Sequence, residues 1–152
     1  MGNYANFLCD RINDYDEAET YYKKAQEIEP EHAHNLGNYG GFLLGRGKYD
    51  EGLTVVNKAI TQAKDEVTLL ECQFYVYAHA KNDAARAKSL SIIKAILLSG
   101  CRSKGWSVRN NINRAIEDGH KNINLLKAIA DVIVDKQQLA IPDKFEEWNQ
   151  IK

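Results

Sequence analysis

The sequence predicts an all-α fold: an α-α superhelix (solenoid) of about three stacked helical hairpins, followed by a C-terminal helical hairpin or cap. The first observation is a repeat with an offset of 34 residues (49 − 15 and 58 − 24), in which Tyr15-Asp16-Glu17-Ala18 returns as Tyr49-Asp50-Glu51-Gly52 and Lys24-Ala25 as Lys58-Ala59. Self-similarity at this period is typical of stacked helical hairpins. The second is an apolar spacing of three, four and seven residues, which forms one stripe on a helix. The third is that no segment alternates with period two, so no strand is expected.

The first two units cover residues 1–31 and 34–64. Their packing positions hold large residues and small ones that let two helices approach closely. In the second unit these are Leu36, Tyr39, Gly40, Leu43, Tyr49, Gly52, Val56 and Ala59. In the first unit they are Met1, Tyr4, Ala5, Leu8, Tyr15, Ala18, Tyr22 and Ala25, and Pro30 ends the second helix. The first unit has one extra residue in its turn, around Ile12 to Asp14.

A third, degenerate unit is expected over residues 66–99, and a C-terminal capping region over 101–152. The register of the third unit stays open, because Lys94-Ala95 and Phe74-x2-Tyr77-Ala78 give different offsets. In the capping region Ser107 is expected to cap a helix that ends at Gly119, with Trp106 packed against its first turn. Asn122 is expected to cap the next helix, and Pro142 to open a short last segment.

The pattern Leu36-x2-Tyr39-Gly40-x2-Leu43, followed by Tyr49-Asp50-Glu51 and Gly52-x3-Val56, resembles the tetratricopeptide repeat family over residues 1–63. The resemblance implies a concave groove, lined by the first helix of each hairpin, that holds an extended or helical peptide. Some members clamp a C-terminal carboxylate with two asparagines and several cations. Asn6 and Asn38 match the asparagine positions, but Gly2 stands where the first lysine is expected, so the clamp is disfavoured.

The candidate peptide groove consists of Asn3, Asn6, Asn38, Gly41 and Gln73. Side-chain amides can donate to and accept from a peptide backbone. Gly37, Gly41 and Gly45 lie on or near the same inner face, and two interpretations stay open. Either a partner packs against the bare backbone, or the glycines serve close packing between helices and a turn.

Charge is segregated along the chain. Residues 1–83 hold 14 Asp/Glu and 8 Lys/Arg, whereas residues 84–116 hold 7 Lys/Arg and no acid. This predicts a basic belt around the third unit, with candidate residues Arg102, Lys104, Arg109 and Arg114 flanking Trp106. The belt suits an acidic peptide, the acidic repeats of another copy, or single-stranded nucleic acid. The overall pI near 6.4 argues against nucleic acid as the main partner.

Other features bound the class of protein. With 152 residues the chain has the size of one domain, and without a run of eighteen apolar residues or a signal sequence no membrane contact is expected. Three widely spaced cysteines fit a reducing, cytoplasmic compartment. Met1 falls inside a repeat position, so the natural chain is a candidate fragment of a longer array.

No catalytic residues, cofactor or metal site are predicted. The sequence has no glycine-rich phosphate loop after a strand, no His-Glu-x-x-His and no CxxC. His32 and His34 are one residue apart, but no third ligand is placed beside them. We therefore expect a non-enzymatic scaffold or adaptor that holds a peptide or partner helix. A self-assembling homo-oligomer is the alternative, and nucleic-acid binding is a remote one.

Overall fold

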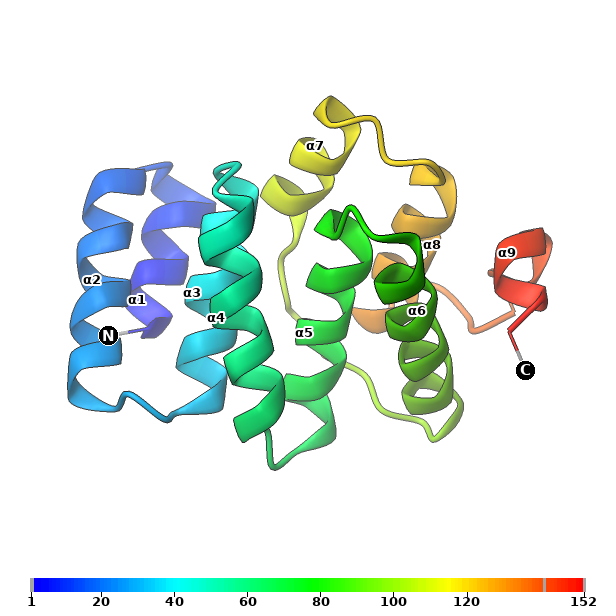
Figure 1. The fold of residues 1–152 in the computed structure, drawn as a ribbon, viewed down its shortest axis with the longest axis horizontal. Coiled ribbons are helices and arrows are strands. Elements are labelled where there is room, and N and C mark those ends of the chain that lie inside the picture. Colours follow the sequence, from blue (N-terminus) through cyan, green and yellow to red (C-terminus); the bar gives the residue numbers. More distant parts are fainter. Residues whose placement is uncertain (1, 141, 152) are drawn as a thin grey trace.

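The computed structural model describes residues 2–140 and 142–151, in which the regular secondary structure is helical and no strand occurs. Met1, which the sequence pattern places in a packing position, lies outside the described residues. The α-helices follow one another along the molecule, and the N-terminus and the C-terminus lie on opposite sides of it (Figure 1). In order they are α1 (Gly2–Phe7), α2 (Tyr15–Ile28), α3 (Ala33–Gly45), α4 (Tyr49–Gln62), α5 (Glu66–His79), α6 (Asp83–Leu98), α7 (Arg109–Glu117), α8 (Ile123–Ile133) and α9 (Glu146–Asn149).

Three consecutive hairpins, α1–α2, α3–α4 and α5–α6, form the predicted helical stack. The seam of the second hairpin shows why the small residues are needed. A Cβ at Gly40 would lie 2.5 Å from Cγ2 of Val56, and one at Gly52 would lie 2.7 Å from Cγ of Leu44. The missing side chains therefore allow α3 and α4 to cross closely. This confirms the prediction of stacked helical hairpins.

The extra residue of the first hairpin forms a π-helical turn, Leu8–Ile12, which ends at Asn13 with a left-handed φ of 60°. Such turns accommodate an inserted residue within a helix. Asp14 then caps α2 by accepting a hydrogen bond from the backbone N–H of Glu17 at 3.1 Å. The core of this hairpin forms its own cluster, which includes Tyr22, Tyr39 and Leu43.

Helix α5 is buried on every side. Residues 70–80 are all buried, because α5 packs against α4 and α6 and also contacts α3, α7 and α8. A helix that is hydrophobic all round is expected at such a central position. The exceptions in its buried stretch are the polar side chains Glu71, Gln73 and His79.

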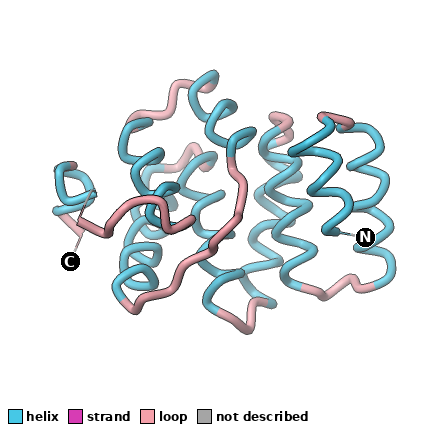
Figure 2. The backbone as a smooth tube through the Cα atoms, turned by 180° about the vertical axis from the view of Figure 1, so that it is seen from behind, coloured by secondary structure: helices cyan, strands magenta, loops and turns pink. Residues whose placement is uncertain are grey.

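The C-terminal segment does not simply continue the stack. A loop over residues 99–108 crosses the face seen in Figure 2 and delivers α7 onto α3 and α5, the first helices of the second and third hairpins. Helix α8 supplies apolar core residues such as Leu126, Ile129 and Ile133. The short 3₁₀ turn Pro142–Lys144 precedes α9, whose Trp148 is fully buried.

Two details of this segment were predicted correctly and two were not. Asn122 caps α8 by accepting from the backbone N–H of Leu125 at 3.3 Å, and Gly119 follows α7 with a φ of 74°. The prediction of a Ser107 cap was wrong, since α7 begins one residue later, after Val108, without a side-chain cap. Trp106 instead packs edge-on against Phe74 and Tyr75 of α5, which fixes the loop before the helix.

Candidate functional site

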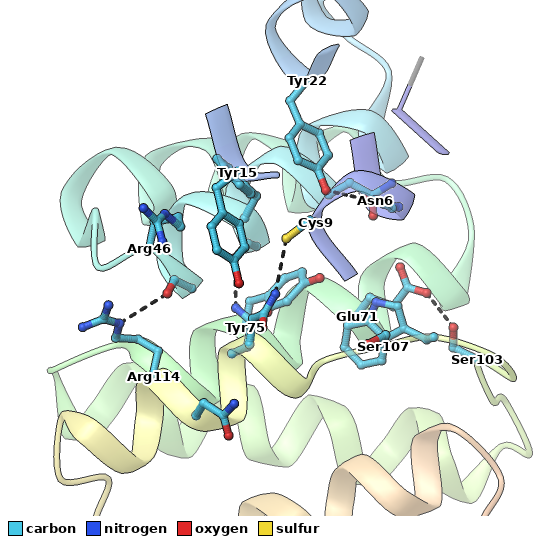
Figure 3. Close-up of a pocket in the computed structure, with 18 of the residues that line it drawn as sticks. Asn6, Cys9, Tyr15, Tyr22, Arg46, Glu71, Tyr75, Ser103, Ser107 and Arg114 are labelled. Carbon is cyan, nitrogen blue, oxygen red and sulfur yellow. Dashed lines mark hydrogen bonds between the residues drawn. The ribbon is translucent and has the colours of Figure 1, made fainter. Parts of the chain in front are cut away.

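A cavity of about 580 Å³ lies along the inner face of α3. One wall comes from α1 and the π turn, another from α5, and the third from residues 103–117 of the returning C-terminal segment. Figure 3 shows Glu71 and Ser103 at one end of this cavity and Arg46 and Arg114 at the other. The concave side of the helical stack is therefore shared between the chain's own segment and an open space.

The inner face of α3 is bare backbone at every fourth residue. Gly37, Gly41 and Gly45 follow this spacing, and at the first two of them side chains of α5 occupy the room that a side chain would take. A Cβ at Gly37 would lie 3.0 Å from Sγ of Cys72, and one at Gly41 would lie 2.3 Å from Cζ of Tyr75. At Gly41 and Gly45 the backbone carbonyls are also accessible to α7.

Polar side chains of α7 hold it on those carbonyls. Asn111 donates through Nδ2 to the carbonyl oxygen of Gly41 at 2.9 Å, and Arg114 donates through Nε to that of Gly45 at 3.3 Å. Asn111 is buried and its Nδ2 also lies 3.0 Å from Nε2 of His79. Burial lowers the pKa of His79 to about 4, so this ring is neutral and can accept that hydrogen bond.

We predict that Asn111→Ala lowers the free energy of unfolding by about 1–3 kcal/mol, because it removes a buried donor from two acceptors. Hydrogen exchange of the α7 amides should accelerate, while α4 and α6 keep their protection. Asn113→Ala is the control, since Asn113 is an exposed asparagine of the same helix. Equal effects of the two substitutions would contradict this role for Asn111.

The loop before α7 is anchored at the other end of the cavity. Ser103 donates its hydroxyl to Oε1 of Glu71 at 2.6 Å, and its backbone N–H donates to the carbonyl of Ile133 at 2.7 Å. Ser103 thus joins α5, α8 and the loop.

Glu71 is the one carboxylate among the buried residues of α5, with a residue exposure of 6%. Burial raises its pKa to about 7, which the hydrogen bond from Ser103 partly opposes. Its second oxygen, Oε2, lies 4.0 Å from Nδ1 of His34, beyond hydrogen-bonding range. Burial also lowers the pKa of His34, so its ring does not supply a compensating charge at neutral pH.

Asn38 is the second polar group of interest in the cavity wall. Its residue exposure is 7%, and its Nδ2 has no hydrogen-bond partner within the described part of the chain. Buried amides are nearly always paired, so an unsatisfied one in a cavity wall needs an explanation. By contrast, the neighbouring Asn6 accepts a hydrogen bond from the hydroxyl of Tyr22.

Of the groove residues expected from the sequence, Asn3, Asn6, Asn38 and Gly41 line this cavity. Gln73 does not, because it is buried in α5. Sequence reasoning missed Glu71, Asn110 and Asn111. The sequence feature that could have pointed to Glu71 is a carboxylate between Leu70 and Cys72, within a stretch that is otherwise nearly all apolar.

The comparison with protein-family models gives one result, a match of residues 13–70 to the tetratricopeptide repeat family. These residues are similar to tetratricopeptide repeats. The match covers α2, α3, α4 and the first turn of α5, where the sequence resemblance is also strongest. Neither curated proteins nor solved structures gave a match. Tetratricopeptide repeats generally mediate protein–protein interaction and typically act as non-enzymatic scaffolds.

The cations of the predicted basic belt have contacts within the chain. Arg102 donates to the carbonyls of Leu97 and Cys101, Lys104 pairs with Asp135 at 3.3 Å, and Arg114 pairs with Glu117 at 3.2 Å. Arg109 is exposed on α7. Two of the four cations, Lys104 and Arg114, already have carboxylate partners within the chain. That the belt binds an acidic partner stays a prediction.

The two histidines between the first and second repeats have structural contacts. His32 caps α3 by accepting through Nδ1 from the backbone N–H of Asn35 at 3.2 Å, and His34 faces Glu71. In the described part of the chain, no group of three or more His, Cys, Asp or Glu residues is arranged to hold a metal ion. A helix long and apolar enough to cross a membrane is likewise missing from the described residues.

Proposed function

We propose that the chain is a protein-interaction module whose cavity takes a short extended segment of a partner protein. The partner segment would lie along the inner face of α3, between the first hairpin and the returning segment 103–117. The proposal rests on the general role of tetratricopeptide repeats and on the polar lining of the cavity. Its groove residues are Asn3, Asn6, Asn38 and Gly41.

The observation that carries the proposal is the buried, unsatisfied Nδ2 amide of Asn38. A peptide carbonyl entering the cavity would accept its hydrogen bond and remove the penalty of the unpaired donor. Tyr75 already covers the backbone of Gly41 in the cavity wall, so the partner segment would lie beside Asn38 and the asparagines of α1. The side chains of Asn3 and Asn6 in the cavity wall can donate hydrogen bonds to the backbone of the same partner segment and accept hydrogen bonds from it.

The test is selection of a phage-displayed random hexapeptide library on the immobilised protein, followed by affinity measurements on the enriched peptides. Asn38→Ala should weaken their binding by about 2–10-fold, the usual worth of one hydrogen bond. Asn57→Ala is the matched control, since Asn57 is an exposed asparagine of α4 outside the cavity. Enriched peptides that bind both variants as well as the unsubstituted protein would contradict the proposal.

A second candidate function is self-association, which a different observation favours. Tyr4, Phe7 and Ile12 along the first hairpin are about half exposed, at 45%, 48% and 55%. Exposed apolar side chains close together mark interaction surfaces. Sedimentation velocity over a range of protein and salt concentrations tests this function. Association through this apolar surface should persist at high salt, whereas contacts between acidic repeats and the basic belt should weaken.

A further inference from the structure

We propose that the partner segment carries a lysine or arginine whose side chain enters the cavity and pairs with Glu71. This inference rests on the proposed function, since it names the chemistry of the segment that the cavity would take. The cation would lie against Oε2, while Oε1 keeps its hydrogen bond from Ser103.

The local geometry leaves Glu71 without a compensating cation. Oε1 is 2.6 Å from the Ser103 hydroxyl, and the nearest ring nitrogen, Nδ1 of His34, is 4.0 Å from Oε2. No lysine or arginine of the described ranges, 2–140 and 142–151, forms an ion pair with Glu71. A buried charge is normally paired, so a carboxylate of this kind in a cavity wall is a candidate for binding.

The other ionisable groups around Glu71 also favour an incoming cation. Asp65, the N-cap of α5, raises the pKa of Glu71 as a like charge. The thiol of Cys72 and the hydroxyl of Tyr75 are buried and have raised pKa values, so both are neutral near pH 7. Lys104, the residue after Ser103, lines the cavity but pairs with Asp135 at 3.3 Å.

The two ends of the cavity differ in charge, which orients the segment. Arg46 lies at the end opposite Glu71 (Figure 3) and would repel a cation there, whereas Arg114 at the same end is paired with Glu117. From His34 to Arg46 the α3 axis extends about 18 Å at 1.5 Å per residue. An extended segment of about five residues covers that length. Asn38, one turn after His34, would donate to a backbone carbonyl of the segment near the basic residue.

A purely structural role for Glu71, as the anchor of Ser103, makes a different prediction. It would change stability but would not select the charge of a ligand. Glu71→Gln tests this, because the amide oxygen still accepts from Ser103 while the charge is lost. Glu66→Gln is the matched control on the same helix, since Glu66 is exposed and does not line the cavity.

The experiment repeats the hexapeptide selection at pH 8 on the unsubstituted protein, Glu71→Gln and Glu66→Gln. We expect lysine or arginine at one common position in peptides from the unsubstituted protein and Glu66→Gln, but not in those from Glu71→Gln. Changing that residue of the peptide to glutamine should weaken its binding to the unsubstituted protein about tenfold or more, the usual worth of a charged hydrogen bond. Binding to Glu71→Gln should change less than about twofold.

Two results would overturn the inference in distinguishable ways. Peptides that depend on Asn38 but show no basic preference, or that keep it in the Glu71→Gln selection, would refute the cation and leave the proposed function standing. A selection without any Asn38-dependent peptide would refute both. Circular dichroism of each variant confirms that the fold is retained before binding is compared.

Discussion

Glu71→Gln is expected to raise the free energy of unfolding by about 3 kcal/mol at pH 8 and by almost nothing at pH 4.5. Burial raises the pKa of Glu71 from 4.5 to about 7, so the folded chain binds a proton here that the unfolded chain releases. Stability from this group is therefore fully present below pH 4.5 and is lost as the pH rises through 7. Glutamine stays neutral and removes that loss.

The measurement is urea-induced unfolding of both proteins at several pH values between 4.5 and 8. Only the difference between the two is interpreted, because His79 titrates in both. Burial lowers its pKa to about 4, so its contribution is lost as the pH falls from 6.5, in the opposite direction. Glu66→Gln, at an exposed position of the same helix, is the control. A difference between Glu71→Gln and the unsubstituted protein that stays constant with pH would contradict the environment assigned to Glu71.

Alanine at Gly41 and at Gly45 is expected to change stability in opposite directions, although both residues lie on one face of α3. A Cβ at Gly41 would come within 2.6 Å of three atoms of the Tyr75 side chain, which is buried against Trp106. We expect this substitution to lower the free energy of unfolding by about 1–3 kcal/mol, the usual cost of overpacking. At Gly45 the nearest atom would be 3.7 Å away. Alanine at Gly45 should therefore raise the free energy of unfolding by about 0.5–1 kcal/mol, because alanine has a better helix propensity than glycine.

Thermal and urea-induced unfolding of the two variants, beside the unsubstituted protein, tests this pair. The result also decides between the two interpretations of the glycines. Opposite signs mean that the chain's own Tyr75 requires Gly41, whereas stabilisation by both would show that the close approach of α5 is wrong.

The repeats could be predicted from the sequence because their packing is local. Tyr39 and Gly40 on one helix, and Gly52 and Val56 on the next, meet within one hairpin of about 30 residues. Their spacing therefore records the contact directly. The family match over residues 13–70 falls where that spacing is most regular.

The position of α7 could not be predicted, because polar contacts across 70 residues leave no periodic pattern. Val108, Ile112 and Ala115 predict a helix but not the surface on which it packs. That surface depends on Asn111 reaching the carbonyl of Gly41. The backbone carbonyl it binds is present at every position and carries no sequence signal.

The candidate site was predicted only in part for the same reason. Asn3, Asn6 and Asn38 were identified because they lie beside the packing stripe on the first helices. Gln73 was assigned to the groove by the same rule, but all sides of α5 are covered, so the rule does not apply to it. Glu71 was overlooked because its importance depends on burial by Ser103 and the rest of the returning loop.

The central claim is that α7 rests on α3 while the cavity beside it stays open to a partner segment. A disulfide between residues 45 and 110 tests it, since a Cβ at Gly45 would lie 3.8 Å from that of Asn110, within the range for disulfides. The variant is Gly45→Cys/Asn110→Cys with Cys9→Ser and Cys101→Ser, so that the fully buried Cys72 is the one native cysteine left. The measurement is the affinity of a selected peptide for its oxidised and reduced forms.

We predict that the bond forms within one molecule and that both forms bind the peptide within about twofold of each other, because α7 does not have to move. The claim would be contradicted if only cross-linked dimers formed. It would also be contradicted if the oxidised monomer lost a peptide that its reduced form binds, because α7 would then have to leave α3 before a partner could enter.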